Sequence, residues 1–126
     1  MEANILTTPF FSLYEPYAVS CALPYFWRMQ TVLLTGVNGF TGHYLAEQLI
    51  KKGYGVVGTG KGTCRLSLTE ENFIYQSLDI TSDDEVQHVF NKYQPDTVIH
   101  SAAMTKPDEC VLNNEAAYLI NVTGTS

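Results

Sequence analysis

The 126-residue sequence predicts an α/β fold built on a small parallel β-sheet. Residues 32–35 read VLLT, an apolar run of the kind that is buried on both faces of such a sheet. Three glycines follow at intervals of three, and apolar residues at positions 45, 46, 49 and 50 then take the spacing of one helix face. This order of strand, glycine turn and helix is typical of the start of a doubly wound sheet.

Each glycine of the turn has a physical use. Gly36 would let the chain turn sharply out of the strand, Gly39 would let the backbone approach a phosphate group, and Gly42 would let the helix pack on the strand. A helix N-terminus attracts phosphate because its first N–H groups are unpaired and carry partial positive charge. The alternative is an ordinary strand, turn and helix with incidental glycines. Their position between strand and helix favours a dinucleotide-binding turn.

Composition limits the function classes. The length allows one domain at most, and a net charge of −6 with 16% charged residues leaves no basic patch for nucleic acid or anionic lipid. Cys21, Cys64 and Cys110 lack metal-ligand spacing, and their odd number argues against a disulfide framework. We therefore predict a cytoplasmic protein without a metal site and without a membrane partner.

Residues 1–28 differ from the rest of the chain. They hold seven of the fifteen aromatic residues and only three charged ones. A signal peptide is disfavoured because the basic n-region is missing, and the apolar part at 17–27 is about half the length that spans a bilayer. We expect a poorly ordered extension outside the fold, with the domain starting at Met29 and occupying residues 29–126.

Three further strands are predicted, over residues 56–59, 73–75 and 97–100, the last of them buried. The link between the second and third strands is too short for a full crossover helix. A helix is predicted after Ser82, where residues 82–85 form a capping box and apolar residues follow at 86, 89, 90 and 93. Another helix is expected over residues 114–122. The predicted sheet is partial, with strand order 3-2-1-4 and helices on both faces.

The segment after the second strand reads GTGKGTCR. In NAD-binding folds an acidic residue near this position bonds the ribose 2′-hydroxyl, whereas a nearby cation suits a 2′-phosphate. No Asp or Glu occurs between Gly55 and Leu68, but Lys61 and Arg65 do, which favours NADP(H) over NAD(H). The alternative is a pair of solvated loop cations. A phosphate-binding loop of the Gly-x4-Gly-Lys type is excluded because Gly62 replaces the required Ser or Thr.

The third and fourth strands are also followed by candidate ligand contacts. Asp79 is either an ordinary carboxylate at a strand end or, with Ile80, a contact for adenine. Small residues at 101–103 would leave room for a ligand at the carboxyl end of the fourth strand, or would serve tight packing alone. His88 is interpreted as a solvated side chain and His100 as a hydrogen-bonded histidine at a strand end.

The segments TGVNGFTG, LDIT, HSAAMTKPDE and NVTGT together resemble the extended short-chain dehydrogenase/reductase family, within the NAD-dependent epimerase/dehydratase superfamily. The likeness covers residues 31–125 and is greatest to the dTDP-4-dehydrorhamnose reductase group. It implies a truncated Rossmann domain and the reduction or epimerisation of nucleotide-linked sugars with a nicotinamide cofactor.

The resemblance also implies site residues. Those lining the pyrophosphate would be Gly36, Asn38, Gly39, Phe40, Thr41 and Gly42. Asp79 and Ile80 would contact the adenine, and Ala102, Ala103 and Met104 would flank the nicotinamide. Asn121 would buttress the site, and Thr105 would approach the substrate.

One departure from the family pattern concerns catalysis. The family's proton donor is the Tyr of a Tyr-x-x-x-Lys motif, and none of the eight tyrosines here has a Lys four positions later. We therefore expect a cofactor half-site with no catalytic residue, forming the N-terminal part of a sugar-nucleotide reductase that is inactive alone. The alternative is a non-catalytic NADP-binding regulatory protein, because the AA-x3-PD spacing at 102–108 is also similar to the beta subunit of methionine adenosyltransferase.

Overall fold

The computed structural model describes residues 29–126, so the predicted extension at residues 1–28 lies outside the described part of the chain. Four parallel strands, β1 (Thr31–Thr35), β2 (Gly55–Gly60), β3 (Phe73–Ser77) and β4 (Thr97–His100), form one sheet in the order β3-β2-β1-β4. The predicted fold class and strand order are therefore confirmed. β1 lies in the middle, where Leu33 pairs with Val57 of β2 and Val98 of β4.

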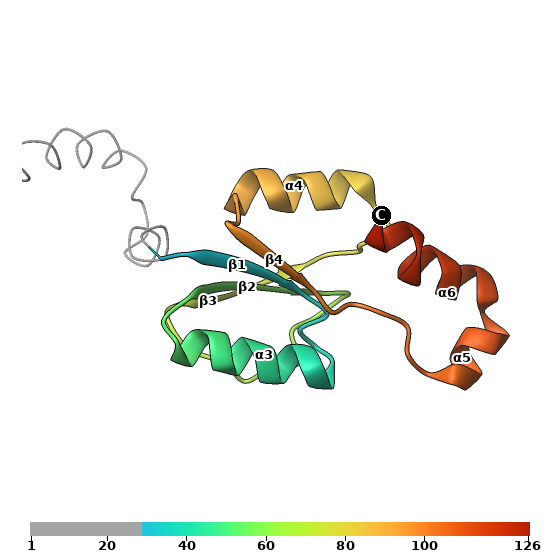
Figure 1. Cartoon of the computed structure of the whole chain (residues 1–126), viewed down its shortest axis with the longest axis horizontal. Coiled ribbons are helices and arrows are strands. Elements are labelled where there is room, and N and C mark those ends of the chain that lie inside the picture. The colour runs from blue at the N-terminus through green and yellow to red at the C-terminus, as the bar shows by residue number, and fades with distance from the viewer. Residues whose placement is uncertain (1–28) are drawn as a thin grey trace, which may run out of the picture.

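Helices cover both faces of the sheet (Figure 1). Helix α3 (Phe40–Lys51) lies on one face and α4 (Asp83–Tyr93) on the other. Helices α5 (Pro107–Leu112) and α6 (Asn114–Asn121) and a short 3₁₀ turn, η2 (Thr123–Thr125), lie beyond the carboxyl ends of the strands. No helix within residues 29–126 has the length and apolar character needed to cross a membrane.

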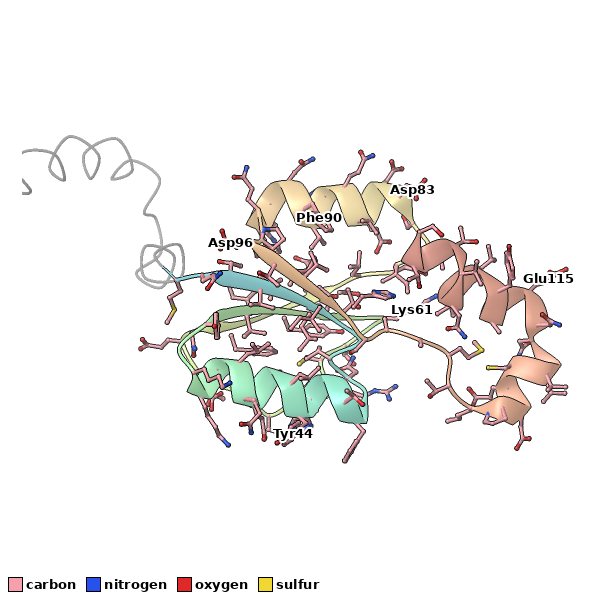
Figure 2. The ribbon with its side chains drawn as sticks, in the orientation of Figure 1. Tyr44, Lys61, Asp83, Phe90, Asp96 and Glu115 are labelled. Atoms are coloured by element: carbon pink, nitrogen blue, oxygen red, sulfur yellow. The ribbon has the colours of Figure 1, made fainter. Side chains whose placement is uncertain are left out.

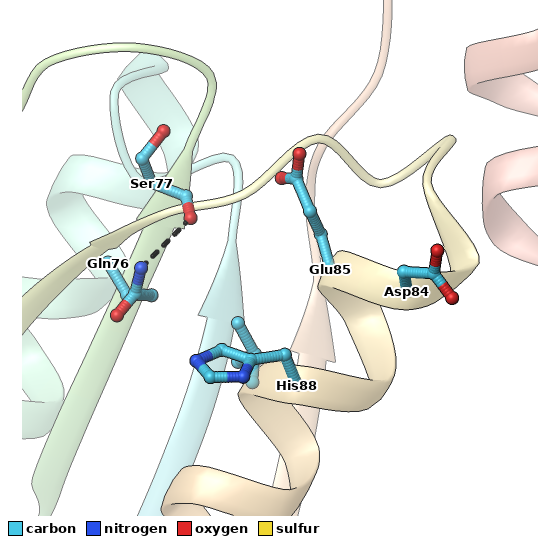
Figure 3. Close-up of a pocket in the computed structure, with 6 residues that line it drawn as sticks. Gln76, Ser77, Asp84, Glu85 and His88 are labelled. Carbon is cyan, nitrogen blue, oxygen red and sulfur yellow. Dashed lines mark hydrogen bonds between the residues drawn. The ribbon is translucent and has the colours of Figure 1, made fainter.

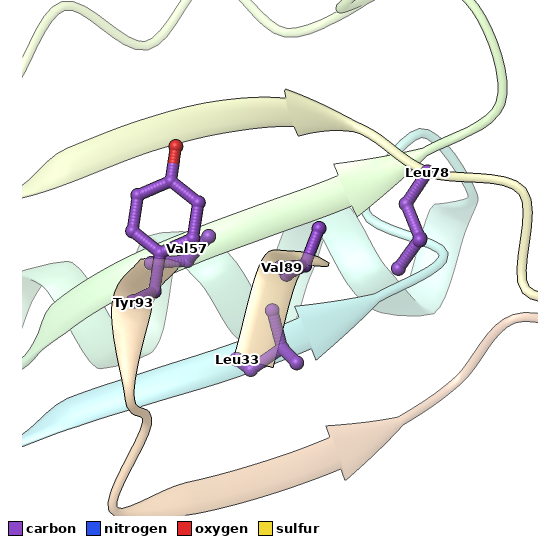
Figure 4. Close-up of a cluster of buried hydrophobic side chains, with 5 residues drawn as sticks. All are labelled: Leu33, Val57, Leu78, Val89 and Tyr93. Atoms are coloured by element: carbon purple, nitrogen blue, oxygen red, sulfur yellow. The ribbon is translucent and has the colours of Figure 1, made fainter. Parts of the chain in front are cut away.

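Two apolar clusters pack the helices against the two faces of the sheet. Every residue of β1 is buried between them. Facing α4, Leu33, Val57, Leu78, Val89 and Tyr93 pack between helix and sheet (Figure 4). Facing α3, the buried residues are Leu34, Val37, Ala46 and Val56. Successive β1 side chains thus point to opposite faces, as the run of apolar residues requires.

Several expectations need correction. β3 extends to Ser77 rather than ending at residue 75, helix α5 was not predicted, and α6 ends at Asn121. Phe90, predicted on the buried face of its helix, is 42% exposed because α4 buries a narrower stripe around Val89 and Tyr93. β4 lies at the edge of the sheet, as the predicted strand order requires, but it is largely exposed there and not buried as predicted.

The core on the α3 side yields a stability prediction. Leu34→Ala should lower the free energy of unfolding by about 3 kcal/mol, because the fully buried side chain leaves a cavity in a closely packed layer. Leu112→Ala is the matched control, since that side chain is 81% exposed and its loss should change stability by less than about 0.5 kcal/mol. Urea unfolding followed by circular dichroism measures both. Equal midpoints for the two variants would contradict the described core.

Candidate functional site

The glycine turn brings the ends of β1 and β4 into close contact. Gly36 has a φ of +71°, in the left-handed region that favours glycine. A Cβ at Gly36 would lie 2.7 Å from both the backbone nitrogen and the Cα of Ala102. A Cβ at Gly42 would overlap the carbonyl oxygen of Gly36 and lie 2.8 Å from the Cα of Val37. Both positions therefore require glycine, as the spacing predicted.

The N-terminus of α3 opens at this turn. Gly39 is the N-cap and provides no side-chain cap, while its own N–H donates to the carbonyl oxygen of Gly36 at 3.0 Å. The first turn of the helix carries no acidic residue. The first N–H groups of a helix have no acceptor within the helix, so the backbone at residues 40–42 presents donors and partial positive charge. This arrangement suits a phosphate.

The side chain of Thr35 joins β1 to the segment after β4. Its Oγ1 accepts hydrogen bonds from the backbone N–H groups of Ser101 (3.1 Å) and Ala102 (3.2 Å), and its backbone carbonyl oxygen accepts from the Ser101 hydroxyl (2.7 Å). The same Oγ1 lies 2.8 Å from Nδ1 of His100, whose Nε2 lies 3.2 Å from Oγ1 of Thr125. His100 is therefore hydrogen-bonded at both ring nitrogens, as predicted, and His88 is exposed, as predicted.

Lys61 and Asp79 form an ion pair at the carboxyl ends of β2 and β3. The distance from Lys61 Nζ to Asp79 Oδ2 is 2.7 Å, and Figure 2 shows Lys61 at the end of the sheet. Oδ1 of Asp79 accepts from both the N–H (3.0 Å) and the hydroxyl (2.6 Å) of Thr81. The Lys61 and Thr81 hydrogen bonds lower the pKa of Asp79 to about 2, and Asp79 raises the pKa of Lys61. The two residues were predicted to contact different parts of a ligand, and the structure brings them together.

The predicted capping box at the start of α4 is half formed. Oγ of Ser82 accepts from the Glu85 N–H at 3.4 Å, as predicted. The Glu85 carboxylate accepts from the backbone N–H of Asp79 at 2.8 Å, whereas the Ser82 N–H donates to the Asp79 carbonyl oxygen. Glu85 therefore fixes the backbone that carries Asp79.

Asn38 faces the loop that follows β2. Its Nδ2 donates to the Thr63 carbonyl oxygen (3.1 Å) and to the Tyr75 hydroxyl (3.2 Å). Its Oδ1 accepts from the Arg65 N–H at 2.9 Å. The predicted turn residue Asn38 and loop residue Arg65 are thus directly connected, while Tyr75 was not among the predicted site residues.

Five further predicted residues, from Ala102 to Asn121, lie along the segment from β4 to η2, whereas Phe40 and Thr41 are exposed at the start of α3 and Ile80 lies between β3 and α4. Ala102 contacts Gly36, whereas Ala103 and Thr105 are exposed. Asn121 binds both backbone polar groups of Met104, at 2.8 Å and 3.0 Å. Ile80 packs against the core beneath α4 and lies beside Gly124 in η2.

A separate hollow lies between the end of β3 and helix α4 (Figure 3). Its volume is about 410 Å³, and it is lined by Gln76, Ser77, Asp84, Glu85, His88 and Val89. None of the predicted ligand contacts lines it. Within residues 29–126, no group of three His, Cys, Asp or Glu side chains could hold a metal ion.

Residues 32–126 match the model of the NAD dependent epimerase/dehydratase family. The chain belongs to this family. The family resemblance inferred from the motifs is therefore confirmed.

Three relatives illustrate the range of this family. The spore coat polysaccharide biosynthesis protein SpsK of Bacillus subtilis is 36% identical over 96 residues, which are 76% of this chain and 29% of SpsK. The dTDP-4-dehydrorhamnose reductase of Aggregatibacter actinomycetemcomitans is 31% identical over 97 residues, 76% of this chain and 28% of the reductase. The crystal structure of the Bordetella bronchiseptica enzyme WbmH in complex with NAD⁺ is similar with a TM-score of 0.63 and 28% identity, over 76% of this chain and 32% of WbmH. The chain thus spans about 30% of the length of these relatives.

The close contact at Gly42 yields a prediction. Gly42→Ala should destabilise the fold by about 2 kcal/mol or more, because the added methyl group overlaps the backbone of the turn. His43→Ala, at the exposed neighbouring position, should change stability by less than about 0.5 kcal/mol. Chemical denaturation of both variants measures the difference. A wild-type midpoint for Gly42→Ala would show that the turn and helix are not packed as described.

The lowered pKa of Asp79 yields a prediction for acid stability. The ionised carboxylate stabilises the fold at neutral pH, and this contribution should be lost as the pH falls from about 4 to the folded pKa of about 2. The difference in unfolding free energy between wild type and Asp79→Asn should therefore be constant above about pH 5 and shrink below about pH 4. Thermal unfolding of both proteins, measured at intervals of about one pH unit from pH 2 to 7, gives this difference in unfolding free energy. A pH-independent difference would refute the assignment, and Lys61→Gln should reduce the acid-dependent part.

Proposed function

We propose that this chain supplies the dinucleotide-binding part of a sugar-nucleotide reductase similar to dTDP-4-dehydrorhamnose reductase. The observation that carries the proposal is the pair of glycines whose missing side chains let the turn, helix α3 and the segment after β4 meet. Membership of the epimerase/dehydratase family and the likeness to the named reductase support it. We assign residues 29–126 to this domain and residues 1–28 to an extension outside it.

The residues at the turn fit a nicotinamide dinucleotide. The backbone N–H groups at the start of α3 would hold the pyrophosphate, since the helix end offers donors and positive charge without a competing side-chain cap. Ala102 and Ala103 would face the nicotinamide, and Asn121 would fix this segment through its two bonds to Met104. The bound cofactor would supply hydride transfer, while these residues bind and orient it.

We propose NADP(H) as the preferred cofactor, with NAD(H) as the second candidate. Lys61 and Arg65 follow β2, and a 2′-phosphate would compete with the Asp79 carboxylate for the Lys61 ammonium. The likeness to WbmH, described in complex with NAD⁺, supports a nicotinamide dinucleotide without favouring either form.

Binding without turnover is the activity we propose for the 126 residues alone. The proposal rests on the eight tyrosines, none of which has a Lys four positions later. The second candidate is a regulatory NADP-binding protein in the cytoplasm, supported by the AA-x3-PD spacing at residues 102–108. Turnover of a dTDP-4-keto sugar by a protein that contains this chain would support the reductase; tight NADP(H) binding with co-purification of a partner enzyme would support the regulatory protein.

The proposal predicts that the chain binds NADPH and that Lys61 contributes to its affinity. Lys61→Gln should raise the Kd for NADPH about tenfold, because it removes a cation and leaves the Asp79 carboxylate unpaired. The Kd for NADH should change less than about twofold, since its neutral 2′-hydroxyl is not repelled. Titration followed by nicotinamide fluorescence measures both constants.

Lys52→Gln is the control for this experiment, since Lys52 is an exposed cation at the opposite end of α3. It should leave both affinities unchanged. Failure of the wild-type chain to bind either dinucleotide would overturn the proposed function. An equal loss of affinity in the two lysine variants would show that Lys61 acts only through the net charge of the protein and not through a specific contact.

A further inference from the structure

The loop that follows β2, residues 61–65, has few contacts of its own that could fix its conformation. All five of its residues are exposed, and Gly62 adopts a φ of +79°. A short exposed loop that follows Gly60 and contains Gly62 has high conformational entropy, so its side chains bind a ligand at an entropic cost. Contacts from outside the loop must therefore define its position.

Tyr75 provides such contacts from the neighbouring strand. Its hydroxyl lies 2.9 Å from the carbonyl oxygen of Gly60 and 2.9 Å from that of Gly62, on either side of Lys61. The Tyr75 ring packs against the apolar cluster facing α3, which anchors the hydroxyl. A Cβ at Gly60 would lie 3.3 Å from this hydroxyl and 2.9 Å from Nδ2 of Asn38, so the glycine leaves room for the contact.

Asn38 completes the connection from the glycine turn. It donates to the Tyr75 hydroxyl and to the Thr63 carbonyl oxygen, and it accepts from the Arg65 N–H. The phenol therefore accepts one hydrogen bond, from Asn38, and its single proton is shared between the carbonyl oxygens of Gly60 at the end of β2 and Gly62 in the loop. Together, Tyr75 and Asn38 tie both ends of the loop to the sheet and to the turn.

We infer that Tyr75, acting with Asn38, is a positioning residue that holds Lys61 and Arg65 in place and thereby favours NADPH over NADH. This inference rests on the proposed function, because it assigns a role to the loop in recognising the 2′-phosphate. Ordering the loop before the ligand arrives removes part of the entropic cost of binding. The benefit applies to the ligand that uses the loop cations and not to one that lacks the phosphate.

Tyr75→Phe tests the inference in the full 126-residue chain, since it removes the hydroxyl and keeps the ring in the apolar cluster. The Kd for NADPH should rise about fivefold, which corresponds to the net contribution of about one hydrogen bond. The Kd for NADH should change less than about twofold, because NADH lacks the 2′-phosphate. Tyr44→Phe is the matched control because Tyr44 lies 60% exposed on α3, and it should change neither affinity. An unchanged ratio of the two affinities in Tyr75→Phe would overturn the inference.

A second background separates positioning from a direct contact with the ligand. In the Lys61→Gln/Arg65→Gln double variant, adding Tyr75→Phe should change the Kd for NADPH less than about twofold, because the cations that Tyr75 positions are gone. A further loss of about fivefold in this background would show that Tyr75 acts on the ligand directly.

Hydrogen exchange tests the clamp without any ligand. The Arg65 amide is bonded to Oδ1 of Asn38, so its exchange should accelerate several-fold in Tyr75→Phe and remain unchanged in Tyr44→Phe. Unaltered exchange in Tyr75→Phe would overturn the clamp whatever the dinucleotide results. A wild-type chain that binds neither dinucleotide would instead overturn the proposed function and the assigned role in specificity, while the exchange result still decides the clamp.

Discussion

The site depends on the backbone contact between Gly36 and Ala102. No side chain separates Gly36 at the end of β1 from the chain leaving β4. At that contact the Thr35 hydroxyl accepts hydrogen bonds from the backbone N–H groups of Ser101 and Ala102. Thr35, the last residue of β1, and Gly36, the first residue of the turn, thus fix how closely the two strand ends approach. Because α3 begins from the same turn, its N-terminus and the segment after β4 are held in one region of the molecule.

The contact also explains why the burial of β1 matters to the site. Every β1 residue is buried between the clusters facing α3 and α4, so the strand cannot shift along its neighbours without exposing apolar surface. Because Gly36 directly follows β1, the fixed register of the strand also fixes the position of Gly36. A rigid strand that ends in a turn with glycines at positions 36 and 39 positions backbone donors better than a mobile loop would.

Patterns within short stretches of sequence gave the most accurate predictions. The glycine spacing, the strand order and the hydrogen-bonded His100 follow from local patterns and from the rules of parallel sheets, and the structure agrees. Besides the boundaries of elements and the unpredicted helix α5, the wrong predictions concern side chains whose surroundings are set by distant parts of the chain. Phe90 fits a helical stripe, but the width of that stripe depends on how α4 lies over the sheet.

The pairing of Lys61 with Asp79 shows the same limit at the site. Both residues were predicted as ligand contacts, yet their mutual contact depends on the register that sets Gly60 beside Ser77. Tyr75 was missed because an aromatic residue in a strand is most simply explained as core, and its ring does pack there. Only its hydroxyl reaches the loop carbonyls. One side chain thus serves the core with its ring and the candidate site with its oxygen, a division that alternation along a strand cannot reveal.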